Sequence, residues 1–279
     1  MTDYIETAGF KDKAALNELF DKCFPGEQGF SRWFFDNMWQ SSNTLLIRYD
    51  GKIISALQML PLELEHKGET MRGCYIFAVG TDPSFEGKGC AGALLKKSFK
   101  ICKDNGLVFS ALIVQQSSLI NYYSRFGYEP IFKVQRINVP ANPACGSIVP
   151  LDSSHIEVLD RIYRQSTNDM LFDARSFERW QQQIEAYKVY GYQKDGEITS
   201  YCFADNRMDG FFAAEACGED AIALVSGAAY KQGKTRAQLL TVCDESKPSE
   251  AIGCFLPLSA KAEEVKASST VFYLNLYYN

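Results

Sequence analysis

The sequence predicts an α/β (α+β) fold, and three features of the residue pattern carry that prediction. Apolar residues recur at helical spacing in segment 16–24 and again in segment 94–102. Asp50-Gly51 separates two strand-like segments and is typical of a two-residue hairpin turn. The apolar segment 107–114 is typical of a strand at the centre of a sheet.

The elements of the first half follow from these signals and from the turn residues between them. Pro25-Gly26 ends the first helix. Asn105-Gly106 ends a later one, because glycine favours the left-handed conformation just past a helix. The predicted strands are 4–7, 44–49, 52–65, 70–79, 107–114 and one after Gly127, and the predicted helices are 16–24, 30–40, 88–103 and 119–125.

The second half repeats this order more faintly. Ser154 and Glu157 form a capping-box pattern ahead of a helix, and Asp195-Gly196 separates two strand-like segments. Self-similarity at the size of a domain favours a duplication, and the alternative is that two common α/β layouts coincide. The predicted elements here are helices 156–163, 177–184 and 220–231 and strands 188–193, 197–203, 210–216 and 235–242.

Prolines mark the division between the two halves. Pro140, Pro143 and Pro150 lie between Asn138 and Asp152, and proline lacks the N–H donor that a helix or a sheet needs. We therefore expect an irregular linker at 139–152 between an N-terminal domain at 1–138 and a C-terminal domain at 153–279.

Composition excludes several classes of protein. The 279 residues are 46% hydrophobic and 23% charged, as in ordinary globular proteins, and the net charge of −5 argues against a nucleic-acid partner. No apolar run approaches the roughly 20 residues that span a bilayer, so we expect no membrane partner. The 9 cysteines form no C-x-x-C pair, and there are 2 histidines, which predicts reduced thiols in a cytoplasmic protein and no metal site.

A glycine-rich segment between a strand and a helix carries the clearest functional signal. Gly87, Gly89 and Gly92 open the helix, where backbone N–H groups lack intrahelical acceptors and the helix dipole favours an anion such as a pyrophosphate. Gly87-x-Gly89-x-x-Gly92 matches the glycine spacing of a dinucleotide-binding motif. In that motif the glycines follow the strand directly, whereas here five loop residues come between the strand and the first glycine. The segment does not match a P-loop, because Gly89 follows Gly87-Lys88 at the position where a P-loop has Ser or Thr. A turn that only connects two elements is the remaining alternative.

Two motifs together resemble the GNAT superfamily, the GCN5-related N-acetyltransferases. The first is Glu86-Gly87-Lys88-Gly89-Cys90-Ala91, and the second, at the expected distance, is the segment from Asn121 to Pro130 with Tyr123 and Gly127-Tyr128. The resemblance covers about residues 1–138. It implies a mixed, mostly antiparallel sheet flanked by helices, followed by a second, degenerate GNAT-like domain. The layout is similar to tandem acetyltransferases of the enhanced-intracellular-survival type.

The resemblance also implies an activity and its residues. The protein would transfer an acetyl group from acetyl-CoA, its co-substrate, to a primary amine on a small molecule or peptide by direct attack, without a metal. Tyr123 would be the general acid beside the thioester sulfur. The residues implied to bind the cofactor, by strand backbone along the pantetheine or by N–H groups around the pyrophosphate, are Val79, Gly80, Thr81, Gly87, Lys88, Gly89, Cys90, Ala91 and Gly92.

Several features stay open at this stage. The general base could be Glu63, Glu65, the carboxylate of Asn279, or water. Glu86 stands where the family pattern has Arg or Gln, and a carboxylate there would repel a pyrophosphate if it pointed inward.

Two other functions stay open: a catalytically silent GNAT-fold protein that binds CoA or a partner, and a nucleotide-dependent oxidoreductase. The acceptor, the acyl length and a homo-oligomeric state are equally open. In the second half, Gly218-Glu219-Asp220 replaces the glycine-rich loop, so we expect no acyl-CoA site there.

Overall fold

A computed structural model describes residues 5–167, 170–172, 175–205, 210–242, 248–268 and 273–274. The described strands are β1 Ile5–Thr7, β2 Thr44–Tyr49, β3 Lys52–His66, β4 Glu69–Thr81, β5 Phe109–Ile113, β6 Glu129–Pro140, β7 Ser147–Leu151, β8 Met170–Phe172, β9 Lys188–Lys194, β10 Glu197–Asp205, β11 Phe211–Gly218, β12 Arg236–Val242 and β13 Glu250–Pro257. The α-helices are α1 Lys13–Cys23, α2 Gln28–Asn37, α3 Cys90–Asp104, α4 Ile120–Ser124, α5 Ile156–Ser166, α6 Phe177–Ala186, α7 Ala221–Lys231 and α8 Ala260–Ser268.

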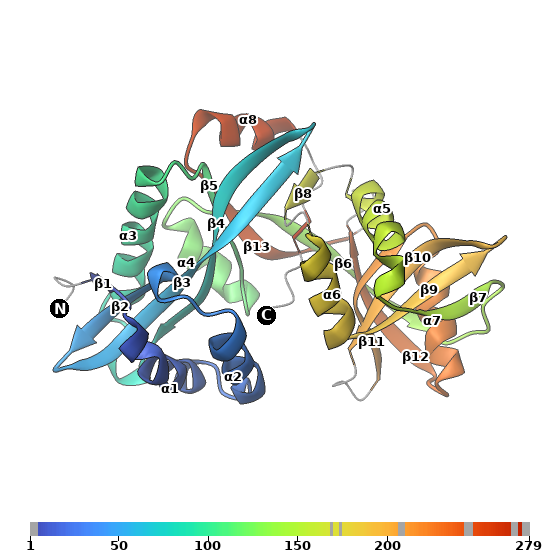
Figure 1. The fold of residues 1–279 in the computed structure, drawn as a ribbon, viewed down its shortest axis with the longest axis horizontal. Coiled ribbons are helices and arrows are strands. Elements are labelled where there is room, and N and C mark those ends of the chain that lie inside the picture. The colour runs from blue at the N-terminus through green and yellow to red at the C-terminus, as the bar shows by residue number, and fades with distance from the viewer. Residues whose placement is uncertain are drawn as a thin grey trace.

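The strands form one mixed sheet that extends through two lobes lying side by side (Figure 1). Its order is β1-β2-β3-β4-β5-β13-β6-β12-β11-β10-β9-β7, and β8 pairs with β3. Among the described pairs, only β4 with β5 and β11 with β12 are parallel, so the sheet is mostly antiparallel. The predicted fold class, a mixed and mostly antiparallel sheet flanked by helices, is confirmed.

Helices cover both faces of the sheet in the N-terminal lobe (Figure 1). Side chains alternate along β4, so Tyr75 and Phe77 join the core beneath α1 and α2, whereas Cys74 and Ile76 join the core beneath α3 and α4. The first of these cores is rich in aromatic rings. Phe77, for example, lies between Phe20, Phe30 and Phe34, with ring centroids 5.1–6.2 Å away.

One interior strand of the N-terminal lobe comes from near the end of the chain. Strand β13 lies between β5 and β6, with Cys254 opposite Leu112 and Glu250 opposite Val134. The sequence patterns assign no strand to 250–257, because its two partners lie more than a hundred residues away. The predicted domain boundaries stay a prediction, but the sheet of the first half includes a strand from the second.

Strand β6 belongs to both lobes. Its first part pairs with β13, and its second part pairs with β12, so Val134 at the change-over faces Glu250 on one side and Val242 on the other. The C-terminal lobe then continues through β11, β10, β9 and β7, with α7 packed on one face and α5 on the other. Its elements follow the order seen in the first half.

The segment expected to be irregular contains a strand at its end. Ser147–Leu151 forms β7, and Pro150 lies opposite Tyr190 of β9. Strand β7 is at the edge of the sheet, where a residue without an N–H donor is tolerated because one side of the strand needs no partner.

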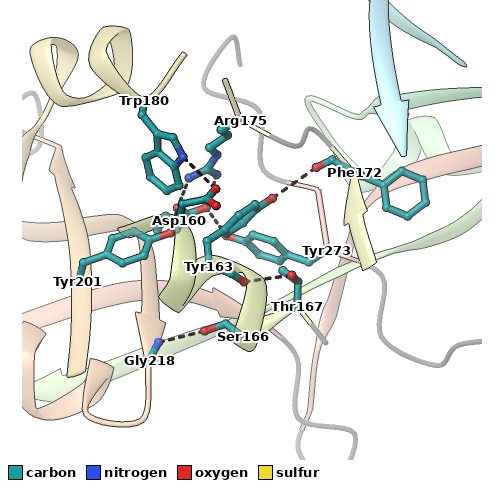
Figure 2. A network of polar contacts seen from close by, with 11 residues as sticks. Asp160, Tyr163, Ser166, Thr167, Phe172, Arg175, Trp180, Tyr201, Gly218 and Tyr273 are labelled. Carbon is teal, nitrogen blue, oxygen red and sulfur yellow. Dashed lines mark hydrogen bonds and ion pairs between the residues drawn. The ribbon is translucent and has the colours of Figure 1, made fainter. Parts of the chain in front are cut away.

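A buried ion pair lies at the centre of a polar network in the C-terminal lobe (Figure 2). Arg175 contacts both carboxylate oxygens of Glu215 on β11, at 2.7 and 2.8 Å, and both side chains are fully buried. Glu215 also accepts hydrogen bonds from the hydroxyls of Tyr201 (2.7 Å) and Tyr273 (3.0 Å). The guanidinium lies 4.1 Å from the ring centre of Tyr163. Four donated hydrogen bonds compensate the desolvated carboxylate.

The two described residues after α8 connect the cores of the lobes. Tyr273 packs in the core of the C-terminal lobe, whereas its neighbour Leu274 packs in the aromatic core of the N-terminal lobe. Both are buried. This short segment therefore contributes to both cores at once.

The shared sheet predicts that the first half cannot fold alone. A fragment of residues 1–140 lacks β13, which would leave β5 and the first part of β6 without their common partner and would expose Phe132 and Leu112. We expect no cooperative thermal transition by circular dichroism, in contrast to the full chain. A cooperative transition in the fragment would contradict this prediction.

Candidate functional site

A gap opens in the sheet where β4 and β5 diverge. The two strands pair only over Gly73–Tyr75 and Phe109–Ala111. Beyond Tyr75, β4 continues to Thr81 along β3 but has no strand partner on its β5 side among the described pairs. The backbone N–H and C=O groups on that side of β4 are therefore available to an extended ligand that carries amide groups.

A bulge bends β4 beside this gap. Gln58 lies opposite Phe77 but Ala56 lies opposite Gly80, so β4 contains one extra residue here. Ala78 has a positive φ of 50°, which is uncommon for a residue with a Cβ and marks local strain. Bulges of this kind redirect the backbone and are frequent next to active sites.

The loop that follows β4 is held in place by Asp82. Its carboxylate accepts a hydrogen bond from the N–H of Ser84 (3.0 Å) and forms an ion pair with Lys22 of α1 (3.3 Å). These contacts hold the pKa of Asp82 below its ordinary value, with the hydrogen bond from Ser84 the largest cause. The chain then turns through Gly87 and Gly89, whose φ values of 73° and 82° favour glycine.

Helix α3 begins with free donors at this loop. Its first hydrogen bond runs from the N–H of Ala93 to the carbonyl of Gly89 (3.0 Å), so the N–H groups of Cys90, Ala91 and Gly92 precede it. The 15-residue helix adds the positive end of its dipole. The predicted anion-binding groups thus converge at one helix N-terminus.

Two charged side chains lie on the loop before α3: Lys88 contacts other residues of the loop, and Glu86 faces solvent. The Nζ atom of Lys88 donates to the carbonyl of Ser84 (3.1 Å) and lies 4.4 Å from the ring centre of Phe85, so the cation stays on the loop. Glu86 is exposed to solvent. Water and salt screen an exposed carboxylate, which weakens its repulsion of a phosphate.

Two of the predicted cofactor residues also have packing roles. A Cβ on Gly92 would lie 2.9 Å from Cζ of Phe126 and 3.8 Å from the hydroxyl of Tyr122, so this glycine allows the segment after α4 to approach α3 closely. The side chain of Cys90 is buried in the core between α3 and the sheet. The backbone N–H groups of Cys90 and Gly92 nevertheless remain among the donors of the first turn of α3.

Tyr123 lies beneath the gap. Its side chain is 9% exposed, and its ring contacts those of Tyr122 and Tyr128 at 5.2 and 5.9 Å. Burial raises the pKa of Tyr123 above its ordinary value, and Tyr122, Tyr75 and Cys254 add to the increase. Ile76 and Leu112, the residues just past the last pair of β4 and β5, belong to the same core as Tyr123, which places Tyr123 near the point of divergence. Its phenol is protonated at neutral pH.

The neighbouring tyrosines have other environments. Tyr122 is half-buried, is covered by the guanidinium of Arg125 at 4.7 Å, and packs on the ring of Phe126 at 5.3 Å. Tyr128 is fully buried and shares a 2.6 Å hydrogen bond with Ser110 of β5. Of these three hydroxyls, that of Tyr123 is both near the divergence point and without a hydrogen-bond partner in the described part of the protein.

The sequence-derived base candidates are not brought to the gap. Glu65 forms an ion pair with Arg164 of α5 (2.9 Å), and Glu63 lies opposite Arg72. Glu63 is three residues beyond Leu60, the partner of Tyr75 at the point of divergence, which is roughly 10 Å along a strand. Asn279 lies outside the described residues.

Two polar residues next to the gap were not anticipated. The Oγ atom of Ser55 donates to the carbonyl of Gly80 and lies 2.8 Å from the hydroxyl of Thr81. The thiol of Cys23 donates to the carbonyl of Thr81 at 3.4 Å, and burial, with Asp82 and Glu86, raises its pKa to about 11. Neither residue belongs to a sequence motif, because their positions depend on how β3 and α1 pack on β4.

The C-terminal lobe has a similar gap, but side chains occupy two backbone donors in the turn before its helix. Strands β11 and β12 pair only over Phe211–Ala213 and Ala237–Leu239. The N–H of Gly218 donates to Ser166 (3.2 Å), and the N–H of Asp220 donates to Ser200 (2.8 Å). These donors are therefore already satisfied before α7.

The described residues contain no group of three or more His, Cys, Asp or Glu side chains that could hold a metal ion. No helix within the described ranges is long and apolar enough to cross a membrane.

Comparison with known proteins identifies the N-terminal lobe. Residues 5–131 match the family described as acetyltransferase (GNAT) domain. No curated protein matches the sequence.

Solved structures share the fold over nearly the whole chain. A probable N-acyltransferase of Enterococcus faecalis has a TM-score of 0.69 at 13% identity, covering 91% of this chain and 72% of its own. A GCN5-related N-acetyltransferase of Anabaena variabilis has a TM-score of 0.69 at 15% identity, covering 92% and 73%. Eis1 of Mycobacterium abscessus has a TM-score of 0.65 at 14% identity, covering 93% and 75%. At these identities the likeness shows a common two-lobed fold.

The packing of Gly92 leads to a stability prediction. Gly92→Val should lower the free energy of unfolding by about 1–3 kcal/mol, because the new side chain displaces Phe126 and loosens α4. Lys97→Val, on the exposed face of the same helix, is the matched control for helix propensity. Equal losses in the two variants, measured by urea denaturation, would contradict the role assigned to Gly92.

Proposed function

We propose that the protein, whose residues 5–131 match the acetyltransferase (GNAT) domain, transfers an acetyl group from acetyl-CoA to a primary amine by direct attack. The observation that carries the proposal is one juxtaposition. The free edge of β4, the free N–H groups at the start of α3 and the phenol of Tyr123 surround a single gap between β4 and β5.

The gap and the helix start match the two halves of acetyl-CoA. The amide groups of the pantetheine can pair with backbone groups of Val79 and Thr81 on the free side of β4, whereas the carbonyl of Gly80 accepts a hydrogen bond from Ser55 of β3. The pyrophosphate can accept hydrogen bonds from the N–H groups between Gly87 and Gly92, at the positive end of α3. Lys88 adds a positive charge to the same loop.

Tyr123 can assist departure of the thiolate. The amine must be neutral to attack as a nucleophile. Its nitrogen forms a bond to the thioester carbon while the carbon–sulfur bond breaks. One proton of the amine ends on the sulfur of CoA. A phenol with a raised pKa keeps its proton, so Tyr123 acts first by donating a hydrogen bond to the sulfur as negative charge develops there. We propose that water carries the proton from the amine, since Glu63 and Glu65 lie away from the gap.

The acceptor is an amine of a small molecule or peptide, and the enzyme is cytoplasmic without a nucleic-acid partner. The net charge of −5 supports a cationic amine in preference to a polyanion. The free cysteines of the described part support a reducing compartment.

A second candidate is a silent GNAT-fold protein that binds CoA without turnover. Glu86 favours it, because a carboxylate stands where the family pattern has Arg or Gln. Binding and turnover experiments separate the two functions.

Acetyl-CoA should stabilise the protein against heat. At about 100 times its Kd the ligand adds roughly 2.7 kcal/mol, which gives a clear increase in Tm. Ala91→Glu places a carboxylate among the free N–H groups and should abolish the increase, whereas the isosteric neutral Ala91→Gln should retain most of it. Failure of acetyl-CoA and CoA to raise the Tm of the wild-type protein would refute the proposed function.

Tyr123→Phe should lower kcat by about 10² or more without weakening acetyl-CoA binding, because only the hydroxyl is lost. Tyr122→Phe removes the neighbouring hydroxyl and is the matched control. The readout is thiol release with a panel of primary amines, together with the acetyl-CoA-dependent Tm of each variant. Similar kcat values for Tyr123→Phe and wild type would remove Tyr123 from the mechanism, and no turnover in the wild type with intact binding would favour the silent protein.

A further inference from the structure

A cavity lies in the C-terminal lobe, away from the gap assigned to acetyl-CoA. Its volume is about 560 Å³, within the range of small-molecule sites. Helix α5, strand β10 and the ends of β11 and β12 line it. Neither the fold comparison nor the proposed transfer reaction gives this cavity a role.

The cavity lies where β11 and β12 diverge. Their parallel pairing ends at Ala213 and Leu239, and the strands then separate as β4 and β5 do. Thr241 and Val242 form one wall, and Val242 lies opposite Val134 at the middle of β6, so the cavity borders the junction of the lobes. Beyond Leu239, β12 pairs with β6 on one side only, and its other side is free to pair with an extended chain.

This site is unsuited to a phosphate. The N–H groups of Gly218 and Asp220 are satisfied by Ser166 and Ser200. The carboxylate of Asp220 accepts a hydrogen bond from Thr199 at 2.7 Å, and Glu219 adds a second negative charge at the same turn. A CoA-like pyrophosphate would meet the carboxylates of Glu219 and Asp220 at this turn.

Charges of both signs nevertheless line the cavity. Arg161 of α5, Glu197 of β10 and Glu219 contribute to its wall. Within the described ranges none of the three forms an ion pair with a protein group. One unpaired cation and two unpaired carboxylates suit a ligand that carries both an ammonium and a carboxylate group.

We infer that this cavity binds a short peptide with free termini. The free edge of β12 pairs with its amide groups, Arg161 binds its carboxylate, and Glu197 or Glu219 binds its ammonium group. Thr199 and Thr241 supply further hydroxyl groups at the wall. The site is independent of acetyl-CoA binding, so the inference does not rest on the proposed transfer reaction.

The test is a titration of the ¹⁵N-labelled full-length protein with a random mixture of unblocked tripeptides. The amide signals of Thr199, Gly218 and Thr241 should shift in a saturable manner, and the same mixture with acetylated and amidated ends should bind at least several-fold more weakly. Signals of Gly87 and Gly89 should stay unchanged, which separates this outcome from peptide binding at the acetyl-CoA site.

Two variants keep the inference falsifiable. Arg161→Gln alters an exposed helix position and should weaken binding about fivefold, as expected for one exposed ion pair. Thr241→Trp should fill the cavity and abolish the shifts, with Lys188→Trp on the exposed start of β9 as the matched control. No saturable shift at the cavity with the unblocked mixture, or equal binding of the blocked one, would overturn the inference.

Discussion

The insertion of β13 between β5 and β6 is the constraint on which the rest of the structure depends. A strand that leaves one neighbour loses backbone hydrogen bonds on that side, and it stays ordered only if the other side is paired. Strand β5 departs from β4 after Ala111 but remains paired with β13 as far as Ile113. The gap beside Tyr123 can therefore exist because β13, a strand from near the end of the chain, pairs with β5 on the side away from β4.

The same constraint explains why the lobes are bound to each other by more than a linker. Strand β6 changes partner at Val134, and Tyr273 and Leu274 pack in different cores. The Arg175–Glu215 pair holds Tyr273 by a buried hydrogen bond. Buried ion pairs often add little net stability, because desolvation offsets their attraction, but leaving one partner alone is costly. This pair thus helps to specify where Tyr273 lies.

Local patterns predicted most elements of the fold, since hairpin turns, helical spacing and glycine stops act over a few residues. The start of α3 and the buried position of Tyr123 lie within two such patterns. Strand β13 was missed because its place depends on partners such as Leu112, far along the chain. The bulge at Ala78 was missed for another reason: nothing in its side chain favours a positive φ, so the surrounding pairing imposes it.

The two lobes differ locally at the turn between the first diverging strand and the helix that follows it. Both have a parallel pair of strands that diverges, and in both a helix begins shortly after the first strand of the pair. In the N-terminal lobe, Gly87-Lys88-Gly89 leaves the N–H groups of the first helical turn unoccupied.

In the C-terminal lobe, Ser166 and Ser200 occupy the donors of Gly218 and Asp220, and acidic residues replace the lysine. Backbone geometry alone therefore does not define the ligand. The two turns differ in their side chains: serines occupy two N–H groups before α7 and acidic residues lie beside them, whereas the gap between the strands is present in both lobes. The cavity of the C-terminal lobe lies at this persisting gap, lined by Gly218 and Thr241 from the two diverging strands.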